Sequence, residues 1–306
     1  IRSCLVGSEM CIRDRYPPLL SASDDAPLLL YGFGDISCLS KVCISIVGTR
    51  KPTAFNRRFT ERLASDLASA GVTVVSGMAI GADTHAHRGA LQAVGGSTAA
   101  VWAAGLDRCY PAVNQQLALQ IAAQGCVLTE MPLATAIKPG LFPRRNRIVS
   151  GLSHAVVVTE AALKSGSMIT ARLALEQNRD VFAVPGVVGR ETSAGCHWLI
   201  KQGAGLVENA QDVIDGLSCF SQLSNLSPVS KPTEESATSV NSSESKIAAL
   251  PATLRQIIES VDDVPTPLEV LHIRTEMPIA ELSAALIDLE LLDLIAVDNG
   301  LYSRLC

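Results

Sequence analysis

Aromatic residues are scarce in this chain, and long apolar runs are missing from it. Phe, Trp and Tyr make up 4% of the 306 residues. No apolar run reaches the roughly 18 residues that a membrane-spanning helix needs. No secretory pattern of basic start, apolar stretch and small-residue cleavage site is found either. These absences exclude the ordinary signals for membrane insertion and export, so we expect a cytoplasmic location and no membrane contact.

The cysteines lack any framework spacing. Nine of them are scattered singly, without a C-x-x-C pair. This pattern argues against a disulfide scaffold and against a four-cysteine zinc site. Several lie in apolar, strand-like runs, and none lies in a recognisable nucleophile motif. We therefore interpret them as reduced core thiols.

Several cofactor and metal motifs are also absent. There is no G-x-x-x-x-G-K-[ST] sequence, which excludes ATP hydrolysis of the P-loop type. The sequence Gly32-Phe33-Gly34 lacks the third glycine and the following helix of a dinucleotide fingerprint. On the helix expected there, His85 and His87 point about 200° apart and cannot share an ion. We predict no metal and no cofactor, and assign Asp83 to capping that helix.

The pattern of apolar runs predicts an α/β fold. A chain of 306 residues exceeds one typical domain, and 48% hydrophobic residues suffice for a sizeable core. Short apolar runs alternate with amphipathic stretches, as strands and crossover helices do in a parallel sheet. The expected strands are residues 42–47, 72–76, 97–101, 126–129, 155–158, 181–184 and 205–207. The expected helices are residues 57–70, 83–94, 114–123 and 170–178.

Charge is distributed unevenly along the chain. The net charge is −5, but residues 41–217 carry 17 basic and 12 acidic groups, a net charge of +5. Residues 246–306 carry 4 basic and 10 acidic groups, a net charge of −6. Any phosphate-binding surface therefore belongs to the middle of the chain.

Composition also predicts the domain boundaries. Residues 218–245 are Ser-rich and without periodicity, which is typical of a flexible linker. We expect one domain at 16–217 and a second at 246–306. Residues 1–15 show no helix or strand period, and we interpret them as an artefact of sequence assembly or a cloning scar.

The basic segment 142–151 is the clearest candidate binding site. Three guanidinium groups and one aromatic ring lie within six positions beside a buried strand: Phe142, Arg144, Arg145 and Arg147. Arginine matches phosphate geometry, and a ring offers a base a stacking partner, so the combination favours single-stranded nucleic acid. The alternative is that these arginines are solvated helix ends or salt-bridge partners.

Three glycine- or serine-bearing turns follow expected strands. They contain Gly48-Thr49-Arg50, Ser76-Gly77 and Ser165-Gly166-Ser167. In an open parallel sheet, ligands bind beyond the carboxyl ends of the strands. Backbone amides of such turns, and the helix N-termini that follow, can hold an anion. Each turn alone could instead be a tight connection that needs glycine.

The last 60 residues predict a winged helix. Helix candidates at 254–261, 266–272 and 279–292 precede strands at 294–297 and 301–303, joined by the turn-forming Asn299-Gly300. The third helix carries acidic groups and no Lys or Arg, which makes phosphate contacts hard to build. Its acidic residues are Glu281, Asp288, Glu290 and Asp293. We predict a protein-interaction or regulatory role for this domain.

These segments carry a family resemblance. Residues 48–50, 76–91, 105–111, 142–153, 165–186 and 197–204 resemble the DNA-processing protein A family, also called DprA or Smf, and the likeness covers 16–217. The resemblance implies an extended Rossmann-like parallel sheet with helices on both faces, plus a small C-terminal winged-helix domain. It also implies binding of single-stranded DNA, a homodimer through the Rossmann-like domain, and loading of the RecA recombinase during natural transformation. It implies no catalytic activity.

The resemblance also implies a set of binding residues. The DNA contacts would come from Gly48, Thr49, Arg50, Ser76, Gly77, Lys138, Phe142, Arg144, Arg145, Asn146, Arg147, Gly166 and Ser167. Two positions depart from the family pattern: many members have Arg where Ile80 stands and Asn where His197 stands. The N-terminal helical domain of many members has no counterpart, so that either the chain is a fragment or residues 1–15 replace that domain.

Two other classes of function stay open. One is a nucleotide-processing enzyme of the related phosphoribohydrolase type, although its Pro-Gly-Gly-x-Gly-Thr-x-x-Glu signature is not found. Glu130 and Glu160 end expected strands and could act as acid or base, but we favour loop anchoring. The other is an interaction scaffold in which the arginines form salt bridges at a subunit contact.

Overall fold

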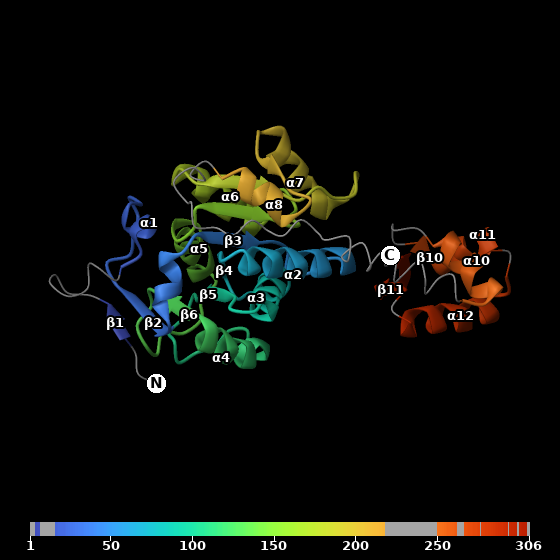
Figure 1. Cartoon of the computed structure of the whole chain (residues 1–306), viewed down its shortest axis with the longest axis horizontal. Coiled ribbons are helices and arrows are strands. Elements are labelled where there is room, and N and C mark those ends of the chain that lie inside the picture. The colour runs from blue at the N-terminus through green and yellow to red at the C-terminus, as the bar shows by residue number, and fades with distance from the viewer. Residues whose placement is uncertain are drawn as a thin grey trace. The chain divides into compact units, whose positions relative to one another are not determined.

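The computed structural model describes residues 16–217, 250–261, 266–275, 277–292, 294–298 and 300–304, together with the strand Cys4–Val6. The chain forms two compact units, a larger one that ends before residue 230 and a smaller one formed mainly by residues 230–306 (Figure 1). Apart from Cys4–Val6, the predicted artefact at 1–15 lies outside the described residues, and so does the predicted linker at 218–245.

A nine-stranded sheet forms the centre of the larger unit. Its strands are β1 (Cys4–Val6), β2 (Leu30–Gly34), β3 (Cys43–Val47), β4 (Thr73–Ser76), β5 (Ser97–Val101), β6 (Cys126–Thr129), β7 (Ala155–Val158), β8 (Asp180–Ala183) and β9 (Gly205–Leu206). The order across the sheet is β1-β2-β6-β5-β4-β3-β7-β8-β9. In this order, each pair of adjacent strands from β6 to β9 is parallel. Strand β2 pairs antiparallel with both β1 and β6.

The strand order reverses next to β3. The chain runs from β3 through β4 and β5 to β6 in one direction, then returns to place β7 on the other side of β3. Crevices for ligands form at the carboxyl ends of strands around such a reversal. The loops that follow β3, β4, β5 and β7 therefore meet at one edge of the sheet.

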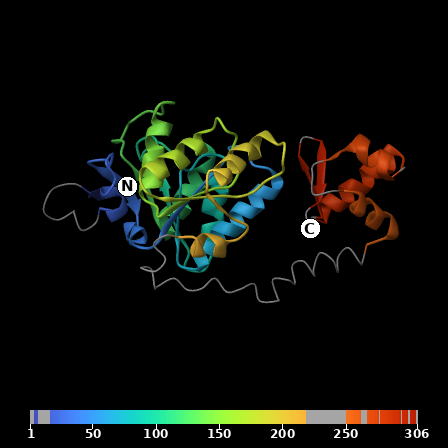
Figure 2. The same cartoon turned by 90° about the horizontal axis from the view of Figure 1, so that it is seen from above.

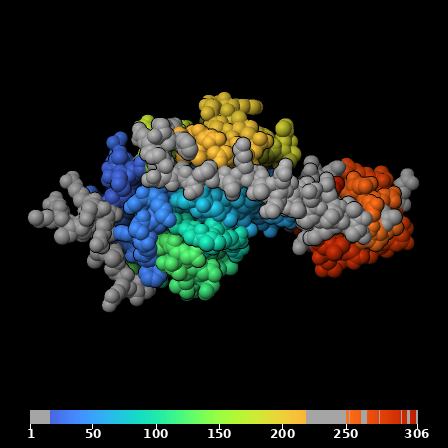
Figure 3. Space-filling view, viewed as in Figure 1, coloured from blue at the N-terminus to red at the C-terminus, as the bar shows by residue number. Residues whose placement is uncertain are grey.

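Helices cover both faces of this sheet (Figures 1 and 2). They are α1 (Pro18–Ser21), η1 (Ile36–Ser40), α2 (Ala54–Ser69), α3 (Ala82–Gln92), η2 (Ala112–Asn114), α4 (Gln115–Gln124), α5 (Leu141–Gly151), α6 (Gly166–Glu176), α7 (Glu191–Lys201) and α8 (Ala210–Asp215). Buried side chains of α1, α5, α6 and α7 share one core, and those of α2, α3 and α8 share another. Helix α4 packs on a third cluster with Met78 and Trp102. In the space-filling view, the surfaces of α2, α3 and α4 lie next to one another on the face of the larger unit that is shown (Figure 3).

Strand β3 shows why the sheet is buried on both sides. All five of its residues are buried. Cys43 and Val47 face the first core, whereas Ile44 and Ile46 face the second, as the two-residue period of a strand requires. Its central Ser45 donates to the carbonyl of Val149 at 2.9 Å, which ties α5 to the middle of the sheet.

The smaller unit has its own core. It contains α10 (Ala252–Ser260), β10 (Thr266–Pro267), α11 (Leu268–Thr275), α12 (Ile279–Leu291), β11 (Ile295–Asp298) and β12 (Leu301–Arg304). β12 pairs antiparallel with both β10 and β11. Leucines 271, 282, 286 and 289 are buried together with Ile257 and Ile258. Three helices and a hairpin are the arrangement that the sequence predicts for a winged helix.

The predicted fold class is correct, and several details differ. The basic segment 142–151, for which no helix is predicted from the sequence, forms most of helix α5, where Pro143 lies in the first turn and needs no amide partner. Helix α3 begins at Ala82, so Asp83 lies inside the first turn instead of capping it. The antiparallel strand β2 and helix α7 are additions to the predicted elements. None of the helices within the described ranges has the length and apolarity of a membrane-spanning segment.

Candidate functional site

An open pocket lies at the carboxyl ends of β3, β4 and β5. Its walls come from the loops after these strands, from the loop before α5, and from α5 itself. Arg50, Gly77 and Trp102 each follow a strand, whereas Phe142 and Arg145 belong to α5. The structure thus brings together four residues that the sequence predicts for one site: Arg50, Gly77, Phe142 and Arg145.

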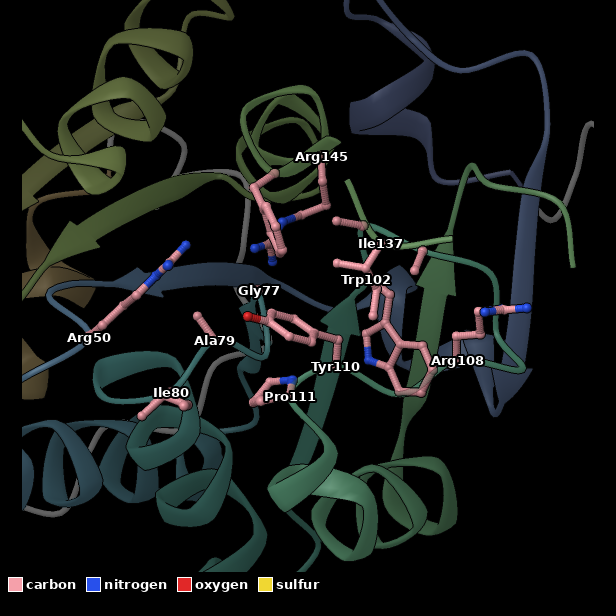
Figure 4. A pocket seen from close by; sticks show the side chains of 13 residues that line it. Arg50, Gly77, Ala79, Ile80, Trp102, Arg108, Tyr110, Pro111, Ile137 and Arg145 are labelled. Carbon is pink, nitrogen blue, oxygen red and sulfur yellow. The ribbon is translucent and has the colours of Figure 1, made fainter. Parts of the chain in front are cut away.

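Arg145 lies in the interior of this pocket. Its side chain extends from α5 toward Gly77 and is only 7% exposed (Figure 4). Nη1 donates a hydrogen bond to the carbonyl of Val101, the last residue of β5, at 2.9 Å. Burial lowers the pKa of Arg145, and the nearby Asp83 opposes that effect. The guanidinium is therefore held between the end of β5 and the first turn of α3.

Asp83 balances this buried charge. Burial raises the pKa of the Asp83 carboxyl, and Arg145 is the largest influence that lowers it again. Its Oδ2 also accepts from the amide of Ala79 at 3.1 Å. Asp83 therefore fastens the loop after β4, in place of the capping role predicted for it, and its carboxyl and the guanidinium of Arg145 shift each other's pKa.

Gly77 is required by the position of Arg145. A Cβ atom at Gly77 would lie 1.7 Å from Nη1 of Arg145, far inside van der Waals contact. The glycine after β4 therefore makes room for a side chain rather than supplying only a flexible turn. Ser76 beside it is fully buried, and its hydroxyl donates to the carbonyl of Ile46 at 2.7 Å.

A cation and two aromatic rings form one side of the pocket. The guanidinium carbon of Arg50 lies 5.7 Å from the ring centroid of Phe142, within the range of a cation–π contact. The ring of Tyr110 lies 5.6 Å from that of Phe142, centroid to centroid, at an interplanar angle of 50°. Arg50 itself is exposed. A planar group that enters here meets a ring face and a solvated positive charge.

The other two arginines of α5 are ion-paired. Arg144 Nε lies 2.9 Å from Oε1 of Glu130, which directly follows β6. Arg147 is buried and binds both Glu130 and Asp25. Neither arginine lines the pocket. Glu130 is thus an anchor for α5, and both Arg144 and Arg147 form salt bridges, as the alternative interpretation expects.

A second cluster forms around the start of α6. Ser167 Oγ donates to the carbonyl of Gly48 at 2.8 Å. The amide of Thr49 donates to the carbonyl of Glu160 at 2.7 Å, and the amide of Ala82 donates to the carbonyl of Thr49 at 3.1 Å. Through these hydrogen bonds, residues 48–49 link the first turns of α3 and α6. Gly166 and Ser167 lie at the N-terminus of an 11-residue helix, where free amides favour anions.

The remaining predicted residues lie around these two clusters. Lys138 is exposed in the loop before α5. Asn146 Nδ2 donates to the carbonyl of Gly166 at 3.4 Å, which links α5 to α6. Ile80 lines the pocket and is 54% exposed, so it adds an apolar side chain to the pocket wall. The ring of His197 on α7 contacts Gly186 and does not line the pocket.

Several pocket residues are absent from the predicted set. Trp102, Tyr110 and Ile137 line the pocket together with Arg108, whose side chain points away from Arg50 and Arg145 (Figure 4). Trp102 follows directly after the expected strand 97–101, in the same placement that singles out Arg50 and Gly77. An aromatic residue at the end of a strand is therefore a signal that could identify it.

The two histidines of α3 have different partners. His85 Nδ1 lies 2.6 Å from Glu61, whereas His87 Nδ1 lies 2.7 Å from the hydroxyl of Thr98 in β5. Within the described part of the chain, no group of three His, Cys, Asp or Glu side chains could hold a metal ion. The two imidazoles thus form hydrogen bonds to different elements on opposite sides of the helix.

We predict that Gly77→Ala will disturb Arg145 and destabilise the larger unit. The added Cβ displaces the guanidinium from Val101, with an expected cost of about 1–3 kcal/mol in the free energy of unfolding. The measurement is urea unfolding followed by tryptophan fluorescence, since both tryptophans, Trp102 and Trp198, lie in this unit. Gly140→Ala is the matched control, because its Cβ would meet open space. Equal stability of the two variants would contradict the prediction.

We also predict a pH-dependent stability from His87. Burial, aided by the charge of Arg145, lowers the pKa of His87 to about 3, and its Nε2 is buried without a hydrogen-bond partner. The unfolded chain takes up a proton below about pH 6.5, so the free energy of unfolding falls as pH drops from there toward 3. Between pH 7 and 5 we expect a loss of roughly 2 kcal/mol that His87→Gln does not show. If the free energy of unfolding of the wild type and of His87→Gln showed the same dependence on pH, this assignment would be refuted.

Comparison with known proteins identifies the family. The family model for DNA recombination-mediator protein A matches residues 10–218, and the model for the DprA winged helix domain matches 241–300. Protein Smf of Escherichia coli (strain K12) is 39% identical over 291 residues, covering 95% of this chain and 75% of that protein. The DNA processing protein DprA of Bacillus subtilis (strain 168) is 42% identical over 204 residues, covering 66% of this chain and 68% of that protein.

Solved structures agree with this result. DprA from Streptococcus pneumoniae aligns with a TM-score of 0.66 and 39% identity, covering 71% of this chain and 75% of that one. DprA from Helicobacter pylori, whose structure describes a single-stranded DNA binding mode, aligns with a TM-score of 0.64 and 31% identity. That match covers 74% of this chain and 98% of the other. The chain therefore belongs to the DNA-processing protein A family, also known as DprA or Smf.

Proposed function

We propose that this protein binds single-stranded DNA without strong sequence preference and delivers it to the RecA recombinase during DNA uptake. The observation that carries the proposal is the pairing of exposed Arg50 with the ring of Phe142 at the pocket. Channels for single strands combine cations for the backbone with rings for the bases. Membership of a family described as recombination mediators, and a relative whose structure describes single-stranded DNA binding, support the same function.

In this proposal, phosphates run along the edge of the sheet. Arg50 and Lys138 supply exposed charge, and the amides at the start of α6 supply hydrogen-bond donors. Phe142 stacks on a base. Arg144 and Arg147 hold α5 in place through Glu130, which positions Phe142 and Arg145 rather than contacting the strand.

We further propose that the protein binds and transfers its ligand without reacting with it. The residues that line the pocket include no carboxylate, imidazole or thiol. Among the side chains that commonly act as general acid or base, the pocket lining therefore offers only the phenol of Tyr110. A homodimer through the larger unit would place two pockets on one strand, so that each protomer grips a separate stretch.

The winged helix is proposed to contact protein rather than duplex DNA. Helix α12 carries Glu281, Asp288 and Glu290 and no Lys or Arg. Phosphate neutralisation needs cations, and acidic side chains repel the backbone. We expect a fragment of residues 246–306 to show no shift of a duplex oligonucleotide at moderate salt. Duplex binding by this fragment in a gel-shift assay would overturn the assignment.

The DNA site is tested by the salt dependence of binding. Arg50→Ala should weaken binding of every single-stranded oligonucleotide and reduce the slope of log K against log salt by about 0.7, the loss of one phosphate contact. Arg147→Met should leave the slope unchanged, since its charge is already paired with Glu130 and Asp25. Fluorescence anisotropy at several salt concentrations measures both effects.

A matched control for this test is Arg62→Ala. Arg62 is an exposed arginine on α2 that pairs with Asp66 and does not line the pocket. Its removal changes the net charge by the same amount as Arg50→Ala. If both variants lost the same slope, the effect would be one of overall charge, and the pocket would not be the binding site.

A further inference from the structure

Helix α12 of the smaller unit is apolar on two opposite faces. One face carries Leu282, Leu286 and Leu289, which are buried in the core of that unit. At about 100° per residue, a second set of apolar residues falls within about 60° of one another on the opposite side of the helix. We call this set the outer stripe of α12, and it consists of Ala280, Ala284, Ile287 and Leu291.

The outer stripe is open to solvent. Ile287 is 57% exposed and Leu291 is 78% exposed, and both alanines are exposed as well. In Figure 1, the other described elements of the smaller unit lie on one side of α12. A helix on the surface of a globular protein normally presents polar residues on the side that faces away from the core. Apolar residues lined up on that side form a contiguous patch of the kind that marks an interaction site.

Carboxylates lie along both borders of the outer stripe. Glu281 and Asp288 follow one border and Glu290 follows the other, and all three are exposed. None of them forms an ion pair with another residue in the described part of the chain. The helix contains no Lys or Arg. The surface is therefore an apolar line between carboxylates that have no cationic partner.

This charge pattern limits what can cover the outer stripe. Nucleic acid is disfavoured, because carboxylates repel its phosphates. An anionic lipid surface is disfavoured for the same reason, since helices that bind such surfaces carry Lys or Arg beside the apolar face. A second copy of the same stripe would bring equal charges together. A protein surface that carries cations beside apolar side chains satisfies both the stripe and its borders.

The spacing of the stripe indicates the shape of that partner. Its members are separated by four, three and four positions, which is the seam along which two helices pack. At 1.5 Å per residue the stripe is about 17 Å long, or three turns. The two alanines allow a close approach at one end, whereas Ile287 and Leu291 project from the other. A helix of similar length with its own apolar seam can therefore lie along it.

We propose that the outer stripe of α12 binds an amphipathic helix of a partner protein, whose apolar seam is bordered by Lys or Arg. This inference rests on the proposed role of the winged helix in protein contact. It adds the surface that makes the contact and the chemistry of the partner that the surface accepts.

The test uses the full chain and two synthetic helical peptides as probes. Each peptide has three heptads with Leu at positions a and d. One carries Lys at positions e and g, the other carries Glu there, and the remaining positions are identical. Fluorescence anisotropy of the labelled peptides should show at least about tenfold tighter binding of the Lys peptide, with a difference that shrinks as salt rises. Equal affinities, or no binding of the Lys peptide, would overturn the inference.

Apolar variants locate the binding on α12. Ile287→Ser and Leu291→Ser should each weaken binding of the Lys peptide by about tenfold. Leu119→Ser is the matched control, because Leu119 is 54% exposed on α4 of the larger unit, and it should have no effect. Far-ultraviolet circular dichroism checks that each variant keeps its helix content. If Ile287→Ser weakened binding no more than Leu119→Ser, the peptide would bind elsewhere and the inference would be wrong.

A pair of charge variants tests the borders of the stripe. Glu281→Gln combined with Glu290→Gln should bring the affinities of the two peptides closer together, because it removes one carboxylate from each border. Glu176→Gln combined with Glu208→Gln is the matched control: it removes the same charge at two exposed positions of the larger unit. An equal effect of both double variants would assign the preference to overall charge and contradict the proposal.

The outcomes separate this inference from the role on which it rests. Duplex binding by the fragment 246–306 would overturn the proposed role of the winged helix together with the inference. Absence of both duplex binding and peptide binding would leave that role intact and overturn the inference alone. Sedimentation of the full chain and of Ile287→Ser adds one further outcome. If the substitution dissociated an oligomer and the Lys peptide did not bind, the stripe would contact a second copy instead of a basic helix.

Discussion

The placement of one buried guanidinium organises the whole site. Arg145 leaves α5, passes over Gly77 and donates to the carbonyl at the end of β5, beside the carboxylate of Asp83 on α3. A buried charge is tolerated only when its partners are close and well oriented, because its desolvation is expensive. The requirement constrains three elements at once: α5 must sit above the ends of β4 and β5, the residue after β4 must lack a side chain, and α3 must present a carboxylate in its first turn. The pocket is the space that remains around these contacts.

The arginines of the basic segment have different partners because of the geometry of the helix. Residues 144, 145 and 147 are close in sequence but lie on different sides of α5. Arg145 faces the pocket, whereas Arg144 and Arg147 meet Glu130 after β6. The carboxylate of Glu130 thereby holds one side of α5, while Phe142 and Arg145 line the pocket. The exposed guanidinium beside Phe142 belongs to Arg50, which follows a different strand.

Much of this can be predicted from the sequence because local patterns control it. Strand β3 reads as a short run of apolar residues, and the turns after β3 and β4 read as glycine-bearing connections to helices, so their convergence at one sheet edge follows from topology. Helix boundaries are harder to predict. The pattern places the start of α6 four residues late, at 170 instead of 166, because Gly and Ser in the first turn resemble a loop. It misses helix α5 for a similar reason: Pro143 signals a break unless it lies in the first turn.

The sequence by itself determined the α/β class, the separate winged helix, the family and the set of basic and glycine residues available for binding, since periodicity and local motifs carry these. Only the tertiary structure decided which arginines of α5 are ion-paired, that Trp102 and Tyr110 complete the pocket, and that Asp83 and Arg145 influence each other's pKa. The physical reason is that an ion pair or an unpartnered donor depends on contacts between residues far apart in the chain. Glu130 and Arg147 meet only after α5 packs against the end of β6, and no local pattern of the sequence records that meeting.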